Sequence, residues 1–183
     1  LSGCGTNSSN ASAQVDTIEQ ELAQVLFINA SANADKVHRL TKGLVQFQKW
    51  DDAFLGYQWL CQYTIEQKFN YCTLMWSSAK QSNKQGILFE AAATIYSLKK
   101  TSYWLQQSYL HASSDIHQLI LKTLQRIPLS KQELAGLIDS PRHHAQALFL
   151  KGKLENDVEL LLQAKRIFTQ YKNWQKYSLI IHH

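Results

Sequence analysis

Two cysteines in the middle of the chain, Cys61 and Cys72, have the clearest potential chemistry. They flank a break in the helical pattern near Lys68 and Phe69, so an antiparallel helical hairpin would bring the two thiols face to face. In an oxidising compartment this arrangement favours a disulfide. Two buried free thiols are an equally supported alternative. We expect no zinc, because the sequence has no Cys-x-x-Cys and no histidine at ligand spacing from either cysteine.

The other titratable side chains form no pattern that is typical of a catalytic or metal site. The histidines are His38, His111, His117, His143, His144, His182 and His183. None of their spacings places two ligands on one helix face, so we expect structural or solvent-facing roles. The acidic pairs, Asp51-Asp52 and Glu155/Glu159, are not set among apolar residues that would raise a carboxyl pKa. Because catalytic motifs are absent as well, we expect no catalytic residue, cofactor or metal.

Large aromatic side chains are the third group that could bind another molecule. Trp59 and Tyr63 fall on one face of a predicted helix, opposite a second group of aromatics on the same helix. Tyr103 and Trp104 have a similar setting later in the chain. Burial between neighbouring helices is the commoner role of such residues. If a partner peptide docks in a concave groove, we expect these four side chains to contact it.

The chain opens on Leu1-Ser2-Gly3-Cys4, and residues 5–14 that follow are rich in Ser, Asn and Ala. An apolar residue, two small residues and a cysteine resemble the lipobox of bacterial lipoproteins. In that family the cysteine becomes the acylated first residue, so the resemblance implies that Cys4 carries a lipid anchor, which holds firmly when it has two or three acyl chains. Gly5 after the cysteine, in place of Asp, implies sorting to the outer membrane. The polar residues predict a flexible tether.

The composition narrows the class of protein. A chain of 183 residues, 45% of them apolar, predicts one domain with a sizeable core. Only two prolines and seven glycines are present, which favours an all-helical protein. The formal charge is +5, but the basic residues are scattered, so nucleic acid is not an expected partner. No apolar stretch reaches the roughly 18 residues that a membrane span requires.

Amphipathic patterns fill the chain from Val15 onward and predict about ten helices. Capping boxes predict two helix starts, at Asp16-x-x-Glu19 and at Ser130-x-x-Glu133. Apolar spacing predicts another helix within 114–127. The residues expected on its buried face are Ile116, Leu119, Ile120, Leu124 and Ile127.

The stretch over 37–60 resembles a tetratricopeptide repeat, which is a pair of antiparallel helices. The residues that carry the resemblance are Val37, Leu40, Thr41, Leu44, Ala53 and Tyr57. A second stretch keeps the same spacings at Leu148, Gly152, Ala164 and Phe168, and Leu88, Ala91, Ala92 and Ile95 are similar to a first helix. The resemblance implies a degenerate array of helix pairs, and a non-repeating helical bundle is the alternative.

These features together predict a lipobox remnant and tether over 1–14, followed by an all-α, tetratricopeptide-like solenoid over 15–183. The resemblances imply an outer-membrane lipoprotein on the periplasmic side. Its helical domain would act as an adaptor or assembly factor for an envelope machine of secretion, pilus formation or cell-wall synthesis. Two alternatives stay open. One is a periplasmic enzyme acting on cell-wall material, and the other is a cytoplasmic helical protein with a chance N-terminal cysteine.

Overall fold

A computed structural model of the chain describes residues 6–27, 33–138, 157–160 and 162–163. Within these residues the regular structure is helical and no β-strand occurs, which confirms the predicted all-α class. The chain divides into two compact units, Leu1–Asn83 and Lys84–His183. The boundary falls inside the single helical domain that the sequence predicts over 15–183, so each unit has its own set of helices.

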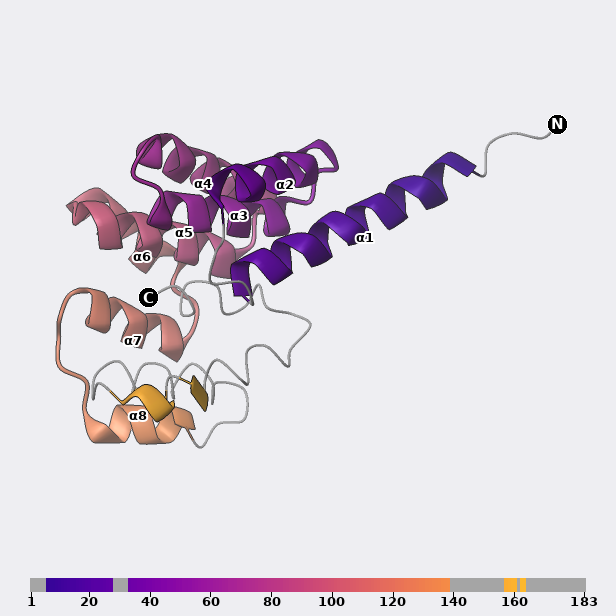
Figure 1. The fold of residues 1–183 in the computed structure, drawn as a ribbon. Coiled ribbons are helices and arrows are strands. Elements are labelled where there is room, and N and C mark those ends of the chain that lie inside the picture. Colours follow the sequence, from indigo (N-terminus) through magenta and orange to yellow (C-terminus); the bar gives the residue numbers. More distant parts are fainter. Residues whose placement is uncertain (1–5, 28–32, 139–156, 161, 164–183) are drawn as a thin grey trace. The chain divides into compact units, whose positions relative to one another are not determined.

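The described part of the first unit consists of α1, α2, α3 and α4. Their bounds are Thr6–Phe27, Ala34–Gln46, Trp50–Tyr63 and Lys68–Ser82 (Figure 1). α3 lies between α2 and α4 and packs against both, whereas α1 packs mainly against α2. Burial follows this order. α2 buries a single stripe of residues, whereas α3 is buried along most of its length because it has a neighbour on either side.

The first helix begins earlier than the sequence predicts. Asp16 and Glu19, the predicted capping box, lie inside α1, which begins at Thr6 and so includes residues 6–14 of the predicted tether. Instead of capping a helix, Glu19 lies 3.8 Å from the Lys49 ammonium, beyond the end of α2. The N-terminal end of α1 extends away from the other helices of this unit (Figure 1).

The helices α2 and α3 approach each other most closely where two small residues meet. A Cβ atom added to Gly56 would lie 1.9 Å from Oγ1 of Thr41, so only glycine fits at this position. Thr41 is itself fully buried, and its hydroxyl donates to the carbonyl of Val37 at 2.7 Å. A threonine with this internal hydrogen bond satisfies its polar group and still leaves room for the neighbouring backbone.

The second unit contains α5, α6, α7 and α8 within the described residues. Their bounds are Gln85–Lys99, Ser102–His111, Asp115–Leu124 and Lys131–Ile138. Residues 158–160 and 162–163 are also helical. α5 packs against α6 and α7. It supplies much of this core, since Leu88, Phe89, Ala92 and Ile95 are all nearly inaccessible to solvent.

The end of α7 differs from the sequence prediction. The helix begins after Ser114, whose hydroxyl accepts a hydrogen bond from the backbone of His117, but it ends at Leu124. Arg126 then adopts a left-handed backbone with φ of 59°. Ile127, which the sequence places on the buried face, is therefore 43% exposed. A helical period assigns faces correctly only as far as the helix continues.

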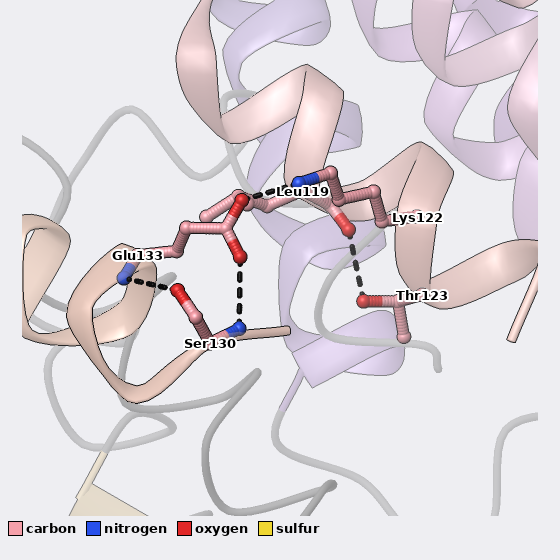
Figure 2. A network of polar contacts seen from close by, with 5 residues as sticks. All are labelled: Leu119, Lys122, Thr123, Ser130 and Glu133. Atoms are coloured by element: carbon pink, nitrogen blue, oxygen red, sulfur yellow. Dashed lines mark hydrogen bonds and ion pairs between the residues drawn. The ribbon is translucent and has the colours of Figure 1, made fainter. Parts of the chain in front are cut away.

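The start of α8 confirms the second predicted capping box (Figure 2). The Ser130 hydroxyl accepts from the backbone N–H of Glu133 at 3.1 Å, and the Glu133 carboxylate accepts from the Ser130 N–H at 2.8 Å. The Lys122 ammonium also donates to this carboxylate and so links α7 to α8. Hydrogen bonds from Lys122, and next from the Ser130 backbone, lower the pKa of Glu133 to about 2.

We expect this carboxylate to support the α7–α8 connection at every pH above its ordinary pKa of 4.5 and to lose that effect as the pH falls through about 2. The sign follows from linkage, because a group with a lowered pKa takes up its proton at lower pH when the chain is folded. An NMR titration of the Glu133 carboxyl carbon measures the midpoint directly. Lys122→Met removes the largest cause and should move the midpoint toward 4.5, and a wild-type midpoint at 4.5 would contradict the network.

Candidate functional site

A disulfide between Cys61 and Cys72 joins the end of α3 to the start of α4. The two sulfur atoms lie 2.03 Å apart and the two Cα atoms 4.7 Å apart. Both residues are buried, with exposed fractions of 0% and 3%. At the other end of the same hairpin, the Ser82 hydroxyl donates to the Asp51 carboxylate at 2.6 Å. The hairpin of α3 and α4 is thus tied at both ends.

The segment between the two cysteines, called the 61–72 loop below, carries three exposed apolar side chains. They are Tyr63, Ile65 and Phe69, with exposed fractions of 50%, 95% and 59%. We call these three residues the apolar tip. They are the only exposed large apolar side chains among the described residues of the first unit. Single exposed apolar residues are ordinary, but a local concentration of them commonly marks a contact surface.

The predicted aromatic residues Trp59 and Tyr63 lie next to each other near the end of α3. Their ring centroids are 5.4 Å apart and the ring planes meet at 41°. Trp59 is partly buried and Tyr63 is half exposed. Partial burial raises the pKa of the Tyr63 hydroxyl through desolvation. The pair therefore has a fixed arrangement with one side open to a partner.

The other predicted pair, Tyr103 and Trp104, lies at the start of α6 in the second unit. The ring centroids are 5.0 Å apart in an edge-to-face arrangement. Tyr103 is 55% exposed, and Leu110 at the other end of α6 is 70% exposed. The two predicted pairs thus belong to separate units. Each pair includes one exposed tyrosine and one partly buried tryptophan.

The two described histidines of the second unit, His111 and His117, contact neighbouring side chains and backbone. Nδ1 of His111 lies 2.7 Å from the side-chain oxygen of Gln85, and burial lowers the pKa of His111. The ring of His117 stacks on Phe89, with centroids 3.9 Å apart. Its Nδ1 accepts a hydrogen bond from the backbone of Ser113. No group of three His, Cys, Asp or Glu side chains that could hold a metal ion occurs among the described residues.

The burial of the acidic side chains is known within the described residues of each unit. Asp52 in the first unit and Glu90 in the second are buried, and they are the only carboxylates of known burial that are. Asp51 is bound by Ser82, and Glu159 lies at a helix start that Asp157 caps.

Several predicted features lie outside the described residues. These are Cys4 with the rest of the lipobox, Glu155, His143, His144, His182, His183 and the second repeat-like stretch at Leu148, Gly152, Ala164 and Phe168. Within the described part of the chain, no helix has both the length and the apolar character needed to cross a membrane.

Comparisons with known proteins found no match to this chain among family models, curated proteins or solved structures. Function must therefore be inferred from the residues themselves. The sequence prediction did not include Ile65 and Phe69, although two apolar residues in a short polar segment between two cysteines were visible in the sequence. Their significance depends on their exposure, which periodicity does not give for a loop.

Proposed function

We propose that this protein is an outer-membrane lipoprotein, anchored through Cys4, whose helical domain binds a protein partner of an envelope machine. The observation that carries the adaptor role is the Trp59–Tyr63 pair. Its rings are 5.4 Å apart, and Tyr63 is half exposed on a helix that is otherwise largely buried. Rigid, partly exposed aromatic side chains contribute most of the binding energy in many protein interfaces, because they bury a large area at a small entropic cost.

The packing of α2 on α3 supports a tetratricopeptide-like helix pair. The six positions that carry the resemblance are all buried, namely Val37, Leu40, Thr41, Leu44, Ala53 and Tyr57. The close contact of Thr41 with Gly56 is the small-residue crossing that such a pair requires. In this proposal further helix pairs continue the array as a degenerate solenoid. Repeats of this kind present extended surfaces that are suited to binding peptide segments.

The proposed compartment is supported by two features of the chain. The disulfide between Cys61 and Cys72 is a bond that persists in the periplasm and is rare in the cytosol. The residues Leu1-Ser2-Gly3-Cys4 resemble a lipobox, as described above. A lipid at Cys4 would hold the domain at the outer membrane, where a partner from a secretion, pilus or cell-wall machine is accessible.

Replacing the predicted lipid acceptor tests the anchor. We expect Cys4→Ser, expressed from its native gene, to be released from the membrane fraction by a high-salt wash that leaves the wild-type protein bound, because serine cannot accept the thioether-linked lipid. Ser2→Ala, which keeps a small residue before the cysteine, is the matched control and should remain in the membrane fraction. Unchanged membrane association of Cys4→Ser after a high-salt wash would contradict the anchor.

Removing the aromatic pair tests the adaptor surface. We expect Trp59→Ala with Tyr63→Ala to reduce co-purification of the partner by at least about tenfold, since two anchoring side chains are lost. Trp59→Phe with Tyr63→Phe keeps the rings and should retain most of the binding. Equal recovery of the same partner by wild-type and double-alanine proteins, both folded by circular dichroism, would place the binding surface elsewhere.

A further inference from the structure

The apolar tip concentrates the exposed apolar surface of the first unit in one loop. Tyr63, Ile65 and Phe69 lie within seven consecutive positions, and every other large apolar side chain of known burial in this unit is buried or partly buried. Ile65 has almost no contact with the protein, at 95% exposure. An aliphatic side chain in this position gains no stability from the fold, so its apolar surface is available to another phase or molecule.

The disulfide fixes the base of the loop on which the tip stands. The Cα atoms of Cys61 and Cys72 are 4.7 Å apart, and α3 and α4 lead away from the loop side by side. The tip is therefore the convex end of a helical hairpin. Because both cysteines are buried, the base of the loop is held in the core of the unit. A protruding apolar end could be covered by a groove on a partner protein. A lipid interface can cover it without any such groove.

Basic residues outnumber acidic residues around this end. Lys68 belongs to the loop, and the contact of His38 with Tyr71, at 3.1 Å between Nδ1 and Oη, places the first turns of α2 beside it. Those turns carry exposed Lys36 and Arg39. The acidic residues here are Asp35 and Glu66. Three cations against two anions, in a chain of net charge +5, match a negatively charged surface.

We propose that the apolar tip inserts into the interface of an anionic lipid bilayer. The apolar side chains would enter the boundary between headgroups and acyl chains, the Tyr63 hydroxyl would stay at headgroup level, and Lys68 and Arg39 would contact lipid phosphates. This contact is separate from the proposed lipid at Cys4, and it shares Tyr63 with the proposed partner surface, so Ile65 and Phe69 are the residues that distinguish the two. Three side chains give only weak affinity, but a domain that is already held at a membrane needs no more than that.

The position of the tip also defines how the first unit would lie on the bilayer. The ion pair of Glu19 with Lys49 places the middle of α1 beside the α2–α3 turn, at the end of the unit opposite the 61–72 loop. The start of α1 lies further in the same direction (Figure 1). A unit held both near its N-terminus and at the apolar tip would therefore lie with α1 along the membrane surface.

Vesicle sedimentation tests this proposal with the full chain carrying Cys4→Ser, so that no lipid is attached. We expect the protein to pellet with vesicles of equal parts phosphatidylglycerol and phosphatidylcholine and to bind pure phosphatidylcholine more weakly. Ile65→Ser with Phe69→Ser should weaken binding to the anionic vesicles by about tenfold, which corresponds to about 1.4 kcal/mol. Both side chains are exposed, so this double variant should remain folded, which circular dichroism checks.

A matched control removes the same number of exposed apolar side chains from the second unit. Leu110→Ser with Ile127→Ser should bind the anionic vesicles as the parent chain does, although these residues are 70% and 43% exposed. Absence of vesicle binding by the parent chain would overturn the proposal, as would equal loss of binding in both double variants. Equal binding to anionic and neutral vesicles would overturn the role assigned to the basic residues. None of these results would bear on partner binding through Trp59.

Discussion

Gly56→Ala should destabilise the first unit by about 2 kcal/mol and lower its melting temperature by about 8–16 °C. The added Cβ atom would lie 1.9 Å from Oγ1 and 2.9 Å from Cβ of Thr41, and a fully buried threonine cannot move aside. Alanine favours the helix by about 1 kcal/mol relative to glycine, which offsets only part of the cost. Differential scanning calorimetry or urea unfolding measures the effect.

A second glycine in a helix provides the control. A Cβ atom added to Gly86, in the first turn of α5, has no atom within 4 Å, so Gly86→Ala should be neutral or slightly stabilising. Thr41→Ala combined with Gly56→Ala should recover part of the lost stability, because the smaller side chain opens the crossing. If Gly56→Ala is as stable as Gly86→Ala, α2 and α3 do not cross at these residues.

Removal of the disulfide should have an effect of similar size. Cys61→Ala with Cys72→Ala should lower the free energy of unfolding by about 3 kcal/mol, which is the loop-closure estimate for a separation of 11 residues. A reductant, added under conditions in which it can reach the buried disulfide, should lower the melting temperature of the wild-type protein to about that of the double variant. The double variant should show no response to the same reductant.

The oxidation state itself can be counted. Alkylation of the denatured, unreduced protein with iodoacetamide should modify at most one of its three cysteines, namely Cys4 when it carries no lipid. Mass spectrometry gives the number of added groups. Modification of Cys61 and Cys72 in protein isolated from its native compartment would contradict both the disulfide and the support that it gives to a periplasmic location.

The sequence predicts local structure well when a single interaction determines the residue pattern. The spacing of Val37, Leu40 and Leu44 predicts the buried stripe of α2, because a helix that packs on one side must place its apolar residues there. The Ser130-x-x-Glu133 box predicts the start of α8 because the interaction is local. Each of the two side chains forms a hydrogen bond with the backbone N–H of the other residue, three positions away.

Other features depend on tertiary contacts, and the spacing of residues along the sequence does not reveal those contacts. Asp16 and Glu19 match a capping box, but the helix continues through them and Glu19 pairs with Lys49 instead. The left-handed residue Arg126 ends the pattern that would have buried Ile127. The exposure of Ile65 follows from where α3 ends and α4 begins, and its proposed role in membrane binding is not encoded in its spacing from other apolar residues.

The most direct test of the adaptor proposal is photo-cross-linking in living cells of the native host, with a photoreactive phenylalanine analogue in place of Tyr63. The replaced side chain is half exposed and lies beside Trp59, so a partner bound there is within reach. The same analogue in place of Lys80, an exposed residue at the other end of α4, is the control. The proposal predicts one dominant envelope protein cross-linked from position 63 and not from position 80. Cross-links from position 63 that match those from position 80, or none at all, would contradict it.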